Sequence, residues 1–208
     1  SEYWLEQGEA YLTWQEWPGA YQDPHSPAVA EFARSHPRQV LVQAYAQWLQ
    51  AGQVQEVQAE ARGRVMDLGL DLDLAVGVNP GGFDTWAHQT LFALDCDIGA
   101  PPDDFSPLGQ NWGLAPLLPQ AMRDQGYRYF IAMLRNNCLP GGALRIDHVM
   151  GLFRLSWIPR GLTAAQGAYV RYPAADLLKI VALESVRHQT LIIGEDLGTV
   201  APSIRQDL

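Results

Sequence analysis

The chain has 208 residues, of which 48% are apolar and 18% charged, and its formal net charge is −9. This is the composition of a globular protein with a sizeable core, and it excludes disordered, collagen-like and disulfide-scaffold classes. No apolar run reaches the roughly 18 residues of a membrane-spanning helix, and the N-terminus has no signal-peptide pattern. The acidic balance argues against nucleic acid or an anionic membrane surface as a partner.

The first third of the chain predicts helices. Ser26-Pro27 has the pattern of an N-cap followed by proline at the first helical position, which starts a helix through about Arg34. Residues 38–62 contain no proline, and their apolar side chains recur near helical spacing. We expect one helix here, or a pair of helices hinged at Gly52.

The rest of the chain predicts alternating strands and helices. Strands are expected at 70–78, 143–149 and 190–194, helices at 119–138 and 174–188, and long irregular loops at 79–119 and 150–173. This order is typical of a parallel sheet with right-handed crossovers. Long loops after the strands favour a (β/α)8 TIM-type barrel over a doubly wound sheet. Three strands cannot close a barrel, so we expect part of one.

We therefore treat 1–208 as one partial catalytic barrel. Residues 1–65 are expected to be mainly helical, and 66–208 to carry the catalytic strands. The chain does not begin with methionine, and 204–208 has the pattern of a helix that stops after about one turn. We expect a segment that is truncated at both ends.

Three acidic residues fall at the ends of the predicted strands, where such folds place their chemistry: Asp73, Asp147 and Glu195. Period-2 alternation puts Arg145 on the same face as Asp147, and its guanidinium favours the ionised form that a nucleophile requires. Glu195 follows an apolar run, which favours the protonated form that a general acid requires.

The spacing of strands bears on the reaction class. Neighbouring strands lie about 4.7–4.9 Å apart. Retaining glycosidases hold their two carboxyl groups about 5–5.5 Å apart, and inverting enzymes about 6.5–9.5 Å. Carboxylates on adjacent strand ends therefore suit a retaining reaction. Taken alone, an acidic residue at a strand end is more often a helix cap, a loop anchor or a solvated charge.

Several segments in order resemble one family. They are Arg145-Ile146-Asp147-His148-Val149-Met150-Gly151, Ile193-Gly194-Glu195-Asp196-Leu197-Gly198, the loop from Gly99 through Phe105 to Gly113, and Trp157-Ile158-Pro159 through Val170. The combination is similar to the amylomaltases, the 4-α-glucanotransferase family of α-amylase-like barrel enzymes. The resemblance runs from about Tyr21 to the end of the chain.

The resemblance implies a role for each site residue. Asp147 is then the nucleophile and Glu195 the general acid and base, with Arg145, Asp73, His148 and Asp196 in support. Gln110, Trp112, Asp103 and Phe105 belong to the loop that lines the sugar subsites, and the flat indole of Trp112 suits a pyranose face. For Phe105, as for Trp86 and Trp157, core packing is the simpler interpretation.

The sequence also departs from the family. The family has a third catalytic carboxylate in a His-Asp pair, and no His-Asp dipeptide occurs in this chain. That carboxylate is expected beyond Leu208, in the remainder of the parent barrel. The isolated segment is therefore expected to be inactive.

The implied function is retaining transfer of α-1,4-glucan segments between maltose, maltotriose and maltodextrins, without a cofactor or a metal. The alternatives are a non-catalytic barrel fragment and a magnesium-dependent, enolase-like barrel enzyme. The enolase-like site needs a Lys or His base, for which only His148 is placed.

Cys96 and Cys138 lack metal-ligand spacing, which favours a reducing, cytoplasmic setting.

Overall fold

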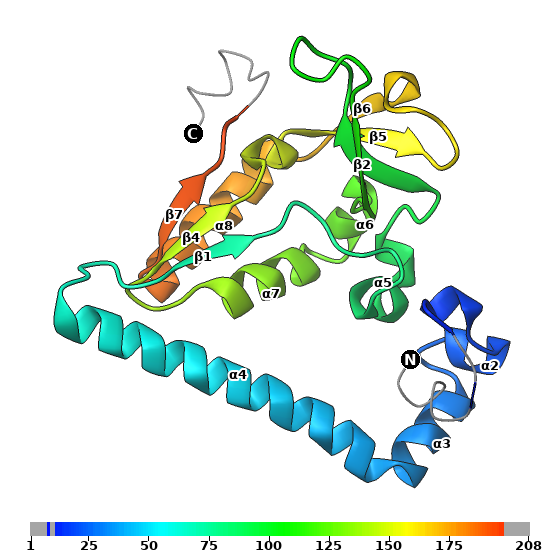
Figure 1. The fold of residues 1–208 in the computed structure, drawn as a ribbon, viewed down its shortest axis with the longest axis horizontal. Coiled ribbons are helices and arrows are strands. Elements are labelled where there is room, and N and C mark those ends of the chain that lie inside the picture. The colour runs from blue at the N-terminus through cyan, green and yellow to red at the C-terminus, as the bar shows by residue number, and fades with distance from the viewer. Residues whose placement is uncertain (1–7, 9–10, 198–208) are drawn as a thin grey trace.

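The computed structural model describes residue 8 and residues 11–197 (Figure 1). The segment 204–208, expected to begin a helix, lies outside the described residues. The chain forms a helical N-terminal part, a parallel sheet backed by helices, and a separate antiparallel sheet. Within the described residues, no helix combines the length and the apolar character that a bilayer crossing needs.

The N-terminal part consists of η1 (Trp14–Glu16), α2 (Gly19–Gln22), α3 (Pro27–Ser35) and α4 (Pro37–Arg64). The predicted N-cap of α3 is confirmed, because the Ser26 side chain accepts a hydrogen bond from the Val29 N–H at 3.2 Å. Of the two alternatives for residues 38–62, the single helix is confirmed and the pair hinged at Gly52 is wrong. Residues 37–64 form one continuous helix of 28 residues, which runs as a long straight rod below the sheet (Figure 1).

Gln58 ties α4 to the beginnings of two strands. Its side chain is buried, and its Oε1 accepts a hydrogen bond from the Leu70 N–H at 2.6 Å. Its Nε2 donates to the carbonyl oxygens of Leu68 and Pro140, each at 3.3 Å. One side-chain amide thus satisfies main-chain groups just before two neighbouring strands, which fixes the helix against that end of the sheet.

The predicted parallel sheet is confirmed. It contains β1 (Asp71–Leu74), β4 (Ala143–Ile146) and β7 (Leu191–Gly194), in the order β1-β4-β7. The register aligns Asp73 with Arg145 and Arg145 with Ile193. β1 is shorter than the alternation to residue 78 predicts, since the chain leaves the ladder after Leu74.

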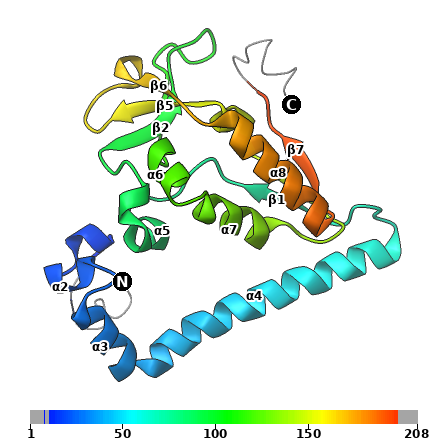
Figure 2. The same cartoon turned by 180° about the vertical axis from the view of Figure 1, so that it is seen from behind.

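Helices cover one face of this sheet. They are α7 (Arg128–Asn137) and α8 (Ala174–His188), and α6 (Pro119–Asp124) packs on the start of α7; Figure 2 shows α8 in front of the strands. The single helix expected over 119–138 is wrong, because Gly126 and Tyr127 take left-handed conformations that break it. Leu74, Leu144 and Ile146 are buried against α7 and α8. The opposite face of the sheet carries Asp73 and Arg145.

The two long connections are not irregular, contrary to the prediction. They contain α5 (Phe83–Ala87), η2 (Gln89–Leu91), β2 (Cys96–Ala100), β3 (Gln110–Leu114), η3 (Val149–Leu152), β5 (Arg154–Pro159), η4 (Ala164–Gln166) and β6 (Ala168–Arg171). The four strands form an antiparallel sheet in the order β3-β2-β5-β6, so the two connections pair with each other through β2 and β5.

Gly99 is required where these strands meet. A Cβ atom at this position would lie 2.1 Å from the Gln110 main-chain oxygen and 2.6 Å from Ile158 Cδ1. The ladder between β2 and β3 shifts register between Ile98 and Gly99. Only a residue without a side chain allows the backbones to approach this closely.

Candidate active site

The carboxyl ends of β1 and β4 form a charged cluster on the open face of the parallel sheet. Arg145 Nη1 lies 2.6 Å from Asp73 Oδ1, and Arg145 Nη2 lies 2.9 Å from Asp147 Oδ1. The hydrogen bond to Asp73 and, after it, the one to Asp147 raise the pKa of the guanidinium above its ordinary value, against partial desolvation. Arg145 is therefore a permanent cation between two carboxylates. The expected placement of Arg145 beside Asp147 is confirmed by these contacts.

Glu195 lies at the end of the neighbouring strand. Its N–H donates to the Ile146 carbonyl at 3.0 Å, just as the Asp147 N–H donates to the Leu74 carbonyl at 3.0 Å. The ladder between β1 and β4 thus extends to Asp147, and the ladder between β4 and β7 extends to Glu195. Both acidic residues therefore lie at the same edge of the sheet. This is the neighbouring-strand arrangement that the sequence predicts.

Two main-chain donors orient the Glu195 carboxylate. The His148 N–H donates to Oε2 at 2.8 Å, and the Leu197 N–H donates to Oε1 at 3.0 Å. The first donor belongs to the residue directly after Asp147. The sequence gives no indication of Leu197, since a main-chain donor leaves no trace in the pattern of side chains.

His148 and Trp112 meet beside the acidic residues. Their ring centroids are 5.2 Å apart at an interplanar angle of 76°, an edge-to-face contact. Burial lowers the pKa of the His148 imidazole, although Glu195 and Asp147 pull it in the opposite direction. Trp112 Nε1 donates to Gln110 Oε1 at 2.9 Å, so β3 brings both of these predicted loop residues to the same place.

The loop between β2 and β3 carries the other two predicted substrate contacts. Asp103 Oδ1 accepts the N–H groups of Phe105 at 2.9 Å and Ser106 at 2.6 Å, so this carboxylate shapes the loop. Phe105 is 96% exposed, and the core interpretation of this residue is wrong. The turn that Asp103 stabilises presents the Phe105 ring to solvent.

Asp196 lies apart from this cluster. It lines an open groove of about 840 Å³ together with residues of β7 and α8, among them Lys179 and Ile192.

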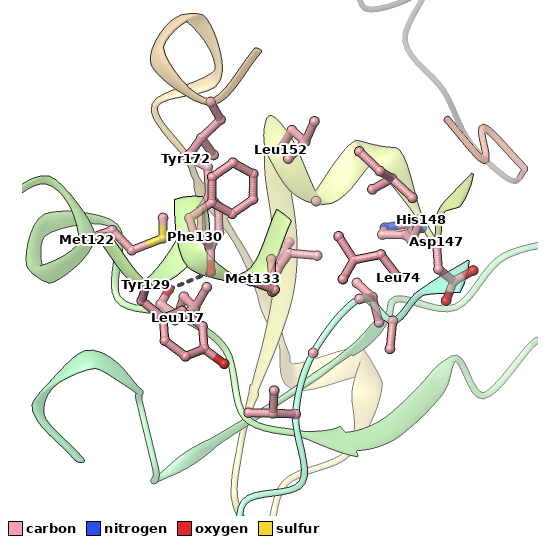
Figure 3. Close-up of a pocket in the computed structure, with 18 of the residues that line it drawn as sticks. Leu74, Leu117, Met122, Tyr129, Phe130, Met133, Asp147, His148, Leu152 and Tyr172 are labelled. Carbon is pink, nitrogen blue, oxygen red and sulfur yellow. Dashed lines mark hydrogen bonds between the residues drawn. The ribbon is translucent and has the colours of Figure 1, made fainter. Parts of the chain in front are cut away.

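A second cavity, of about 80 Å³, lies between the sheet and its helices. Figure 3 shows Asp147 and His148 at one end of this cavity, opposite Met122, Phe130 and Tyr172. Its wall is mostly apolar, which explains the desolvation of His148.

The chemistry of the cluster is that of paired carboxylates. Asp147 is held by a cation, and Glu195 by neutral N–H donors, so the two acidic groups have different surroundings at one sheet edge. Among the described residues, no group of three or more His, Cys, Asp and Glu side chains is arranged to hold a metal ion.

Comparison with known proteins identifies the family. The family described as 4-alpha-glucanotransferase matches residues 3–208. The chain is 44% identical to the 4-alpha-glucanotransferase of Haemophilus influenzae over 96% of its length, and 42% identical to that of Mycobacterium bovis over 99%. It belongs to the 4-alpha-glucanotransferase family.

Solved structures agree on the fold. The amylomaltase of Corynebacterium glutamicum matches 79% of this chain with a TM-score of 0.73 and 38% identity, over 23% of its own length. The Streptococcus agalactiae amylomaltase in complex with acarbose matches 99% with a TM-score of 0.81 and 21% identity, over 44% of its length. The chain spans only 29% of the Haemophilus relative and 28% of the Mycobacterium relative.

Proposed function

We propose that this chain supplies two catalytic groups of a 4-alpha-glucanotransferase (amylomaltase), as part of a (β/α)8 barrel. The substrates are α-1,4-glucans such as maltose, maltotriose and longer maltodextrins. The observation that carries the proposal is the arrangement at one sheet edge. There Arg145 donates a hydrogen bond to Asp147, and the main-chain N–H of His148 donates one to Glu195. Because the chain belongs to the 4-alpha-glucanotransferase family, we assign the glucan-transfer reaction to these residues.

The reaction is a double displacement. Asp147 attacks the anomeric carbon of the donor glucan while Glu195 gives a proton to the departing glycosidic oxygen, so the C–O bond breaks as the bond to Asp147 forms. Glu195, now ionised, takes the proton of the acceptor's 4-hydroxyl. That oxygen displaces Asp147 and restores the α-linkage. No cofactor enters either step.

The supporting residues divide between charge and binding. Arg145 binds the Asp147 carboxyl group with one arm of its guanidinium fork, and Asp73 holds the other arm. Trp112 offers an apolar platform to a sugar ring, Gln110 lies beside it, and Asp103 shapes the loop that presents Phe105. His148 follows Asp147 and donates its N–H to Glu195, whereas Asp196 follows Glu195 in the chain and lines the neighbouring groove. The third carboxylate and the remaining barrel strands come from the rest of the parent protein, and the isolated segment is inactive.

The setting is a reducing one such as the cytoplasm. Cys96 and Cys138 are both free thiols, and burial is the main cause that raises the pKa of each. Thiols of raised pKa are poor nucleophiles, which suits a packing role.

The enolase-like alternative is disfavoured because Arg145 takes the place between Asp73 and Asp147 that a shared magnesium ion would need.

The test uses the complete gene product that contains these residues. Incubation with maltotriose is expected to release glucose and longer maltodextrins, which thin-layer chromatography and mass spectrometry resolve. Asp147→Asn is expected to abolish the transfer, because the carboxamide cannot form the glycosyl ester. Asp71→Asn is the matched control, since Asp71 lies on the same sheet face at the other end of β1. Transfer that survives Asp147→Asn contradicts the assignment.

A further inference from the structure

His148 has an unusual backbone conformation. Its φ is 48° and its ψ is 62°, in the left-handed region. The other described non-glycine residues with positive φ are Tyr127 and Gln189, and all three are helix caps, His148 at the start of η3. A side chain in this region costs roughly 1–2 kcal/mol. At residue 148 the conformation falls directly after Asp147, on the edge of the sheet where the acidic residues meet.

The conformation redirects the main-chain donors of the chain. The Asp147 N–H donates to the Leu74 carbonyl, toward β1. The next two N–H groups turn to the other neighbour: His148 donates to the Glu195 carboxylate at 2.8 Å, and Val149 to the Glu195 carbonyl at 2.9 Å. The left-handed conformation of His148 thus lets consecutive N–H groups at the end of β4 bond to opposite neighbours, Asp147 to β1 and the next two residues to Glu195.

The imidazole packs rather than hydrogen-bonds. Its ring stands edge-to-face with Trp112 and lines the apolar cavity (Figure 3). In the described part of the chain its ring nitrogens have no hydrogen-bond partner, whereas its main-chain N–H donates to the Glu195 carboxyl group. The polar contribution of His148 to the site is therefore made by its backbone.

We propose that His148 is a positioning residue whose left-handed main chain holds the Glu195 carboxylate for proton transfer. The inference rests on the proposed function and adds a further residue to it. It explains why a costly backbone conformation is placed beside Asp147: the turn sets Glu195 relative to the nucleophile. A displacement of about 1 Å at such a group costs on the order of a hundredfold in rate.

Substitutions that separate backbone from side chain test this in the complete protein. Glycine and asparagine accept the left-handed conformation and keep the N–H, whereas the β-branched valine disfavours it. His148→Gly and His148→Asn are expected to lose less than about fivefold in kcat. His148→Val is expected to lose about a hundredfold, with KM within about twofold of wild type. Thermal unfolding measured on all variants identifies any loss that reflects misfolding.

A donor with an activated leaving group identifies the step. Fluoride departs from an α-maltosyl fluoride with little help from an acid, so the first-turnover release of fluoride does not need a well-placed Glu195. His148→Val is expected to release fluoride within about threefold of the wild-type rate. A variant that has lost the nucleophile or the general shape of the site loses both reactions together.

The outcomes are distinct. If the wild-type protein shows no transfer on maltotriose, the proposed function fails and this inference fails with it. If the wild type is active and His148→Gly and His148→Asn lose as much kcat as His148→Val, the imidazole is the active part and the inference alone is overturned. The same holds if His148→Val matches wild type, or loses fluoride release and maltotriose transfer equally.

Discussion

The two sheets of this protein are specified by different parts of the sequence. Each strand of the parallel sheet has its own apolar pattern, and β4 and β7 each follow a helix, so β1, β4 and β7 can be found from local sequence. The strands of the antiparallel sheet come from the two long connections, and its central pair, β2 and β5, joins segments far apart in the chain. A local pattern predicts the first kind of sheet and misses the second.

Composition explains why the second sheet is missed. β2 has the sequence Cys-Asp-Ile-Gly-Ala and β3 the sequence Gln-Asn-Trp-Gly-Leu, and Gly, Asp and Asn are all depleted in strands. These residues form strands because tertiary pairing overrides propensity. Yet the second sheet is well packed, since Ile98 and Ile158 are almost completely buried. A weak sequence signal therefore does not imply a weakly packed sheet.

The largest expected effect tests that statement in both sheets. Leu144 in β4 and Ile158 in β5 are each 0% exposed. Leu144→Ala and Ile158→Ala are each expected to lower the free energy of unfolding by about 2–5 kcal/mol, because each removes a fully packed side chain and leaves a cavity. Urea denaturation followed by circular dichroism measures both.

Leu183→Ala is the control for that pair. Leu183 lies on α8 and is 47% exposed, so its loss is expected to cost less than about 1 kcal/mol. If Ile158→Ala lowers the free energy of unfolding no more than this control, the antiparallel sheet contributes little to stability. The statement that both sheets are equally well packed would then be wrong.

The candidate site divides along the same line. Asp73 and Arg145 lie in predictable strands, and Asp147 and Glu195 directly follow such strands, so their meeting at one sheet edge could be expected from the sequence. The contact of Trp112 with His148 could not, because it depends on the position of β3 in the second sheet. The main-chain donors of His148 and Leu197 have no side-chain signature. The resemblance to a family supplied roles where physical pattern gave only positions.

The next effect concerns the predictable part of the site. Arg145→Met in the complete protein is expected to lower kcat about a hundredfold, because Asp73 and Asp147 then face each other without the cation that both contact. Arg145→Lys is expected to recover only part of this loss, since a single ammonium cannot bond both carboxylates as the guanidinium fork does. Steady-state transfer from maltotriose measures the series.

A surface arginine provides the control. Arg34 pairs with Glu31 on α3, and both side chains are largely exposed. Arg34→Met is expected to leave kcat unchanged and to alter stability by less than about 0.5 kcal/mol. Wild-type kcat in Arg145→Met would show that Asp147 does not depend on this cation, and the role assigned to Arg145 would be withdrawn.

The smallest effect concerns α4, where the sequence left open a hinge at Gly52 that the fold does not contain. Gly52 lies inside the continuous helix, and a Cβ atom there would meet no other atom within 4 Å. Gly52→Ala is therefore expected to raise the free energy of unfolding by about 0.5–1 kcal/mol, the usual gain from replacing glycine in a helix interior. Urea denaturation measures the gain, with transfer from maltotriose expected to be unchanged. A loss of stability or of transfer would mean that the helix bends at Gly52 in solution, and the hinged alternative would then hold in this segment.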